Sequence, residues 1–176
     1  NTFGVMGETY RFLKENNCSM VYSEGQHDLK ARSVYSRLKL YIESKIMINV
    51  NVNVNEIINK FFKYYYDKAG DTMKAFFEEM VQWGYYQEET WPAVFNGTIY
   101  NVANNADYWN ANTLSKWEDA CYKAIEEISY LEKSKPADYD MYRDNILIES
   151  IFPRWALLEL FSNNFSSAEL DARRRS

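Results

Sequence analysis

Three residues near the N-terminus could carry out acid–base chemistry. Glu24 follows Cys18–Ser23, a short segment rich in β-forming residues, and Asp28 follows four residues later with His27 between them. A carboxylate at the end of a strand could bind a sugar hydroxyl or transfer a proton. Glu24 could equally be a solvated or helix-capping residue, Asp28 is more typical of a helix cap, and a lone loop histidine is usually exposed. We therefore keep Glu24 as the one catalytic candidate.

A second group of side chains could bind sugars through flat apolar rings. Aromatic residues are dense in and around the irregular segment from Tyr85 to Asn112, which contains Pro92 and Gly97. Such rings suit the C–H faces of pyranoses, and binding residues concentrate on loops. A long loop can also use aromatic residues to hold itself in place, and this alternative stays open. The carbohydrate-binding candidates are Trp83, Trp91, Tyr100, Tyr108 and Trp109.

Other catalytic patterns are absent from the sequence. It contains no Gly-rich phosphate loop, no nucleophile elbow and no Glu-x-x-His motif for a di-iron site. Tyr41 and Lys45 have the spacing of the short-chain dehydrogenase pair, but without a Gly-rich dinucleotide turn this match is a coincidence. One histidine and two separated cysteines give no zinc pattern. We therefore expect no metal and no cofactor, and we do not expect the isolated chain to be an enzyme.

Composition indicates a folded protein that binds neither nucleic acid nor membranes. The 176 residues are 47% hydrophobic, enough for one sizeable core. The net charge of −5 argues against a general nucleic-acid binder, and the basic cluster Arg173–Arg175 is interpreted as a solvated tail. No apolar run reaches the ~20 residues that span a bilayer. Cys18 and Cys121 could form one disulfide or remain as two buried thiols, and we favour the thiols.

Hydrophobic spacing predicts helices along most of the chain. A first helix should end near Asn16 and Asn17, the segment Cys18–Ser23 should form a strand, and a helix should cover about residues 28–48. Ile48–Asn55 alternates aliphatic residues with Asn, which is a strand period. Asn is nevertheless a poor strand former and a good cap, so we predict an extended connection in which Asn53 or Asn55 caps the next helix.

The rest of the sequence predicts further helices separated by short breaks. They begin near Asp71, Thr113 and Asp138 or Asp140, and a kink or short break is expected at Pro153. Short connections favour antiparallel neighbours. The predicted fold is therefore mainly α, an antiparallel helical bundle with one short strand near the N-terminus.

A set of residues in the N-terminal half follows a recognisable pattern: Glu24-Gly25, Leu38, Tyr41, Lys45, Asn49, Phe61-Phe62, Tyr65-Tyr66, Ala69, Met73 and Phe76. In this pattern the chain resembles an uncharacterised bacterial domain-of-unknown-function family that is similar to glycoside hydrolases. Members of this family look like α-glucuronidases and β-N-acetylhexosaminidases, with a TIM barrel followed by a helical region. The resemblance covers about residues 8–85 and departs from the family pattern at Ile48, Val50 and Asp67.

The resemblance implies that the chain is one piece of a longer protein. Residues 1–48 would be the last βα unit of an otherwise absent (β/α)8 barrel, and residues 49–176 a helical C-terminal domain. The implied function is the binding or breakdown of polysaccharide by the parent protein, in an extracellular or cell-surface bacterial location. Its partners would be an oligosaccharide or polysaccharide and the rest of the parent chain. The alternative is a non-catalytic helical scaffold or protein-interaction module.

Overall fold

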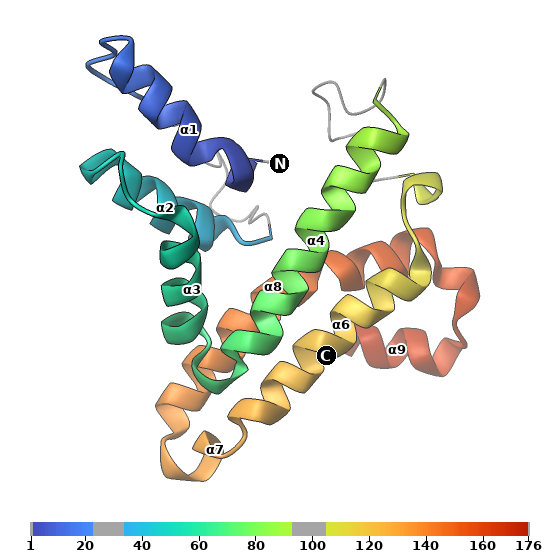
Figure 1. The fold of residues 1–176 in the computed structure, drawn as a ribbon. Coiled ribbons are helices and arrows are strands. Elements are labelled where there is room, and N and C mark those ends of the chain that lie inside the picture. The colour runs from blue at the N-terminus through green and yellow to red at the C-terminus, as the bar shows by residue number, and fades with distance from the viewer. Residues whose placement is uncertain (1, 23–33, 93–104, 176) are drawn as a thin grey trace.

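The fold is mainly helical, which confirms the general prediction (Figure 1). The computed structural model describes residues 2–22, 34–92 and 105–175. Figure 1 shows α4, α6 and α8 running along one another, while α1 and α2 lie to one side. The helices and 3-10 turns are α1 (Thr2–Glu15), α2 (Ser36–Ile48), α3 (Val54–Tyr65), η1 (Asp67–Ala69), α4 (Gly70–Thr90), η2 (Ala106–Tyr108), α6 (Ala111–Ile128), α7 (Leu131–Ser134), α8 (Pro136–Leu160), η3 (Ser162–Asn164) and α9 (Ser167–Arg175).

The connection after α1 corrects one prediction. Helix α1 ends in a Schellman-type cap: Asn17 is left-handed with φ 59°, and the backbone N–H of Cys18 donates to the carbonyl of Leu13 at 2.9 Å. Residues 18–22 then form no strand, so that prediction is wrong for this part of the segment. A strand needs a neighbour to pair its backbone groups, and Met20 and Tyr22 are more than 80% exposed. Glu24 lies outside the described residues.

The Asn-rich alternation connects two helices, as predicted, but through a turn rather than an extended segment, because the backbone N–H of Val52 donates to the carbonyl of Asn49 at 3.3 Å. Helix α2 ends at Ile48 and α3 begins at Val54, with Asn53 as the N-cap. The Asn53 side chain accepts from the backbone N–H groups of Asn55 at 3.0 Å and Glu56 at 3.3 Å. It thereby satisfies two of the donors that a helix start leaves unpaired.

Two further expectations concern Pro153 and the cysteines. Helix α8 runs from Pro136 to Leu160 with the buried Pro153 inside it, so the short break does not occur, and a kink there stays a prediction. Neither cysteine is in a disulfide: Cys121 is buried, as expected, whereas Cys18 is exposed and donates to the carbonyl of Met20 at 3.1 Å.

The antiparallel order of the helices in the bundle stays a prediction.

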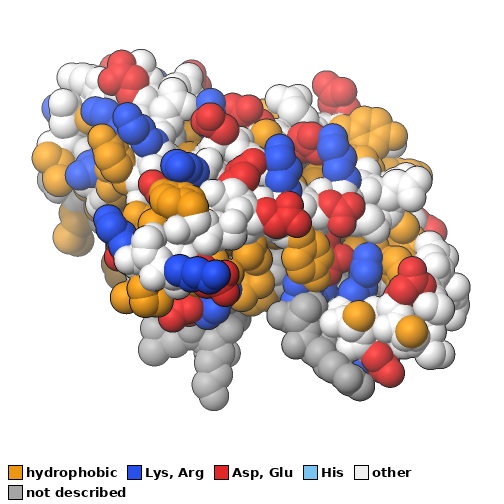
Figure 2. Space-filling model, turned by 90° about the horizontal axis from the view of Figure 1, so that it is seen from below, with side chains coloured by type: hydrophobic (Ala, Val, Ile, Leu, Met, Phe, Trp, Pro, Cys, Tyr) orange, Lys and Arg blue, Asp and Glu red, His pale blue; other side chains and the backbone are white. Residues whose placement is uncertain are grey.

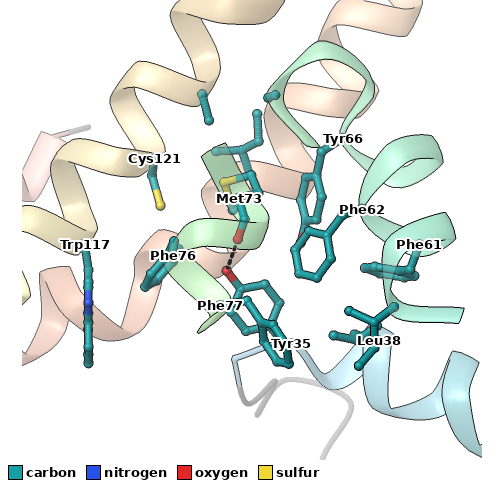
Figure 3. Packing of buried hydrophobic residues seen from close by; sticks show 14 of the residues in the cluster. Tyr35, Leu38, Phe61, Phe62, Tyr66, Met73, Phe76, Phe77, Trp117 and Cys121 are labelled. Atoms are coloured by element: carbon teal, nitrogen blue, oxygen red, sulfur yellow. Dashed lines mark hydrogen bonds between the residues drawn. The ribbon is translucent and has the colours of Figure 1, made fainter. Parts of the chain in front are cut away.

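The core is built around aromatic side chains from α3 and α4 (Figure 3). Tyr35, which precedes α2, is 1% exposed, and its ring lies 5.8 Å from that of Phe62 and 5.1 Å from that of Phe77. Its hydroxyl donates to the backbone carbonyl of Met73 at 3.0 Å. Buried phenols need such an acceptor, so this bond fixes the start of α2 against α4.

Glu149 of α8 holds the N-terminus of α2. Its Oε2 atom accepts from the backbone N–H of Tyr35 at 2.6 Å, and its Oε1 accepts from the hydroxyl of Tyr66 at 3.3 Å. The N-cap residue Tyr35 is left-handed, with φ 56°, and its side chain caps nothing. In a capping box the side chain of the third helical residue would accept from the backbone N–H of Tyr35, but here that residue is the buried Leu38, which has no acceptor. Glu149 supplies the acceptor from another helix instead.

A second buried carboxylate joins the C-terminal helices. Glu118 of α6 is 1% exposed and lies 3.1 Å from Nε of Arg154 on α8 and 3.2 Å from Nη2 of Arg173 on α9. Two guanidinium groups compensate the desolvation of this carboxylate. Arg173 therefore lies in a buried ion pair rather than in the solvated tail expected from the sequence. On the face shown in Figure 2, charged side chains of both signs surround separate hydrophobic patches.

Two glycines offer a matched test of the packing between α3 and α4. A Cβ atom at Gly70 would lie 2.7 Å from the backbone oxygen of Phe62, whereas one at Gly84 would meet nothing within 4 Å. We expect Gly70→Ala to lower the free energy of unfolding by about 1–3 kcal/mol because the backbones must separate. Gly84→Ala should raise it by about 0.5–1 kcal/mol. Urea denaturation measures both, and equal stabilities would contradict the close approach.

Glu149 should make stability depend on pH. Burial raises its pKa from 4.5 to about 7, opposed by the hydrogen bonds from Tyr35 and Tyr66 and by the charge of Arg37. Between these two pH values the folded protein holds a proton that the unfolded chain releases. The contribution of this carboxyl group is therefore fully present below about pH 4.5 and is lost as the pH rises to about 7.

The Glu149→Gln variant isolates this effect, because the amide oxygen still accepts from Tyr35 and the group carries no charge. Relative to the wild type, the variant should gain about 2–3 kcal/mol in free energy of unfolding between pH 4.5 and pH 7.5. Urea denaturation at several pH values measures the difference. A difference that stays constant across this range would rule out titration of Glu149.

Candidate functional site

The structure describes four of the five carbohydrate-binding candidates. Trp83 lies on α4, Trp91 directly follows that helix, Tyr108 is in η2 and Trp109 comes just after it. Tyr100, like the catalytic candidate Glu24, lies outside the described residues.

These aromatic residues divide into three environments. The rings of Trp91 and Tyr108 meet edge to face at 5.5 Å, and Trp91 is 43% exposed. Trp109 packs against Phe152 of α8 at 5.0 Å, so it holds the loop onto the bundle, as the structural alternative proposed. Trp83 packs against Tyr86 at 5.6 Å, one turn along the same helix. The fold therefore does not gather all four residues into one surface.

A concave site lies around Trp83, where the end of α4 passes the start of α6. This hollow, which we call the α4–α6 hollow, has a volume of about 280 Å³, just below the range of roughly 300–1,000 Å³ that is typical of small-ligand sites. Its lining combines aromatic rings with a carboxylate, an amide and a hydroxyl group. The lining residues are Glu79, Gln82, Trp83, Tyr86, Thr113 and Trp117.

Most of the lining comes from one face of α4. Glu79, Gln82, Trp83 and Tyr86 follow the i, i+3, i+4, i+7 spacing of a helix face, a signal in the sequence that could have found them. Thr113 comes from the first turn of α6, which the side chain of Asn110 caps at 2.9 and 3.1 Å. No sequence pattern pairs that turn with α4.

The hollow has both polar and aromatic character. Glu79 accepts from Nζ of Lys116 on α6 at 2.6 Å, and both side chains are more than 40% exposed. Tyr86 is 54% exposed, whereas Trp117 is 2% exposed and meets Trp83 edge to face at 6.3 Å. The exposed ring of Tyr86 and the Glu79–Lys116 pair therefore face solvent above a floor made by Trp117.

Several buried polar atoms without hydrogen-bond partners lie near this end of α4. Among the described residues, Nε1 of Trp83, Nε1 of Trp117 and Oε1 of Gln87 are buried and have no partner. Gln87 lies one turn after Trp83, and its Nε2 donates to the backbone carbonyl of Tyr108 at 2.6 Å. Native structures leave few buried polar atoms unpaired, so a cluster of them marks a place where water or a ligand completes the hydrogen bonding.

Other features limit the chemistry of the described residues. Burial raises the pKa of the Cys121 thiol, so this group stays protonated and is no nucleophile. Glu149 is enclosed by the core and does not line the α4–α6 hollow. Within residues 2–22, 34–92 and 105–175, no group of three or more His, Cys, Asp or Glu side chains could hold a metal ion. In the same ranges no helix is both long and apolar enough to cross a bilayer.

Comparison with known proteins gives a family match over less than half of the chain. Residues 2–78 match the model of a family described as a domain of unknown function (DUF4838). The matched segment contains α1, α2, α3 and the start of α4, and it ends just before Glu79, the first residue of the α4–α6 hollow. No curated protein and no solved structure gives a significant match.

Proposed function

We propose that the chain is the helical portion of a glycoside-hydrolase-like protein and that it binds carbohydrate at the α4–α6 hollow. The observation that carries this proposal is the combination of an exposed aromatic ring, hydrogen-bonding side chains and unpaired buried polar atoms at one end of α4. Sugars offer apolar C–H faces together with hydroxyl groups that donate and accept, so they require both kinds of contact.

Each side chain has a separate task in this proposal. The ring of Tyr86 packs against the face of a pyranose, while Gln82 and Thr113 hydrogen-bond to its hydroxyl groups. Glu79 accepts from another hydroxyl and is held in place by Lys116. The small volume fits one sugar ring better than a long chain. Trp91 and Tyr108 provide a neighbouring aromatic pair.

The site has no arrangement for cleaving a glycosidic bond. Glycosidases generally use two carboxyl groups on opposite sides of the bond, whereas Glu79 is the one carboxylate that the described residues place in the hollow. In the proposed parent protein, residues 1–48 complete a barrel and Glu24 contributes to its active site.

The second candidate function is a non-catalytic scaffold or interaction module. Large apolar side chains exposed on α2 and α3 favour it: Leu40 is 60%, Ile48 83% and Tyr64 70% exposed. The two functions are compatible because these side chains lie on different elements from the α4–α6 hollow.

Tyr86→Ala tests carbohydrate binding, and Tyr85→Ala is its matched control. Both tyrosines are more than 40% exposed on α4, but only Tyr86 lines the hollow. Oligosaccharides should bind the wild type with a dissociation constant of about 1 mM, and Tyr86→Ala should weaken binding at least about tenfold. Tyr85→Ala should bind like the wild type. Titration of Trp fluorescence with a panel of neutral, N-acetylated and acidic oligosaccharides measures this binding.

Two results would contradict the proposal. One is unchanged fluorescence of the wild type across the whole panel. The other is equal loss of binding in both variants, because it would place the ligand away from the hollow.

A further inference from the structure

A second concave surface lies between α2 and α3, inside the segment that matches the family model. We call it the α2–α3 groove. Its volume is about 430 Å³, larger than the α4–α6 hollow and well within the range of binding sites. Its lining is mainly apolar and aromatic, with two cationic side chains. The lining residues are Arg37, Leu40, Tyr41, Lys60, Phe61, Tyr64 and Tyr65.

The groove has a rigid aromatic floor and apolar edges. Phe61 is 8% exposed, stacks on Tyr65 at 4.5 Å and meets Tyr41 at 5.7 Å. Leu40 and Tyr64 are 60% and 70% exposed. Because the floor packs against the core, burying the edges would require little rearrangement. Exposed apolar side chains gathered around a groove mark a surface that gains from being covered.

The charge of this region is opposite to that of the whole protein. Residues 36–65 contain five Lys and Arg but only two Glu, whereas the chain carries a net charge of −5. Among the described ion pairs, none includes Arg37 or Lys60, although the charge of Arg37 also acts on the buried carboxyl group of Glu149 and lowers its pKa. Two cations at an apolar groove favour an occupant that is both apolar and anionic.

The lining separates this groove from the proposed sugar site. Among the described residues, no Asp, Glu, Asn or Gln side chain lines the groove, so its side-chain acceptors for sugar hydroxyls are the neutral phenol oxygens of Tyr41, Tyr64 and Tyr65 and include no carboxylate. The α4–α6 hollow, by contrast, offers both Glu79 and Gln82. Aliphatic and aromatic side chains flanked by carboxylates match the α2–α3 groove better than a carbohydrate does.

We propose that the α2–α3 groove binds an acidic amphipathic helix of a partner polypeptide. Bulky apolar side chains from one face of that helix would lie over Phe61 and between Leu40 and Tyr64, in the helix-in-groove mode of recognition. Carboxylates beside this apolar face would pair with Arg37 and Lys60. This interaction is independent of carbohydrate binding, because it uses residues of other elements.

A pair of synthetic peptides tests the proposal. The probe is a fluorescein-labelled helix of about 16 residues with Leu and Phe on one face and Glu on the others. The control peptide keeps every apolar residue and replaces each Glu by Lys. In fluorescence anisotropy, the Glu peptide should bind saturably and the Lys peptide at least about tenfold more weakly. Raising the salt concentration from about 0.05 M to about 0.5 M should weaken binding of the Glu peptide.

Paired double variants of the full chain locate the binding site. Arg37→Ala with Lys60→Ala should weaken binding of the Glu peptide at least about tenfold. Lys123→Ala with Lys133→Ala removes the same charge from α6 and α7 and should leave binding unchanged. All four side chains are exposed, so circular dichroism should show that both variants keep the helical fold.

Several outcomes would overturn the proposal. They are equal binding of both peptides, equal binding by both double variants, and absence of saturable binding by the Glu peptide. Sedimentation of the chain alone tests a different occupant. Self-association that Arg37→Ala with Lys60→Ala abolishes would show that a second copy of the chain covers the groove.

Discussion

The hydrogen bond from the backbone N–H of Tyr35 to the carboxyl group of Glu149 is the contact on which the arrangement of the two halves depends. Helix α2 begins after Tyr35, a left-handed N-cap residue whose side chain is buried in the core. The third residue of the helix, Leu38, has no side-chain acceptor for the backbone N–H of Tyr35. Glu149 lies 114 positions later in the sequence and supplies the acceptor. A buried carboxyl group is costly unless it is neutral or fully hydrogen-bonded. The hydroxyl of Tyr66 donates to the second oxygen of Glu149, so both carboxyl oxygens have a hydrogen-bond donor.

This contact joins the family-matched segment to the rest of the bundle. Tyr35 and Tyr66 belong to residues 2–78, whereas Glu149 lies on α8. The same two tyrosines also belong to the aromatic core, in which α3 and α4 pack closely enough to require Gly70. Because polar and apolar contacts share these residues, the start of α2 cannot move without disturbing the core. The floor of the α2–α3 groove is therefore fixed by the packing behind it.

The two concave surfaces have different chemistry and different positions relative to the family match. The α2–α3 groove is apolar and cationic and lies within the matched residues. The α4–α6 hollow begins where the match ends and combines one exposed aromatic ring with a carboxylate, an amide and a hydroxyl group. A binding surface shared by members of the family would therefore lie at the α2–α3 groove rather than at the α4–α6 hollow. The proposed carbohydrate binding would instead depend on residues of α4 and α6 that follow the matched segment.

The sequence by itself determined the local structure. Helical periodicity, the end of α1 near Asn16 and Asn17, and a cap at Asn53 or Asn55 depend on residues within a few positions of one another, so their patterns can be read directly. Residues 18–22 misled the prediction because β-forming composition does not supply a partner strand. Only the tertiary structure decided that Glu149 caps α2, that Arg173 pairs with the buried Glu118, and that Thr113 faces Trp83. These contacts join residues far apart in the chain, and their geometry exists only once the helices have packed.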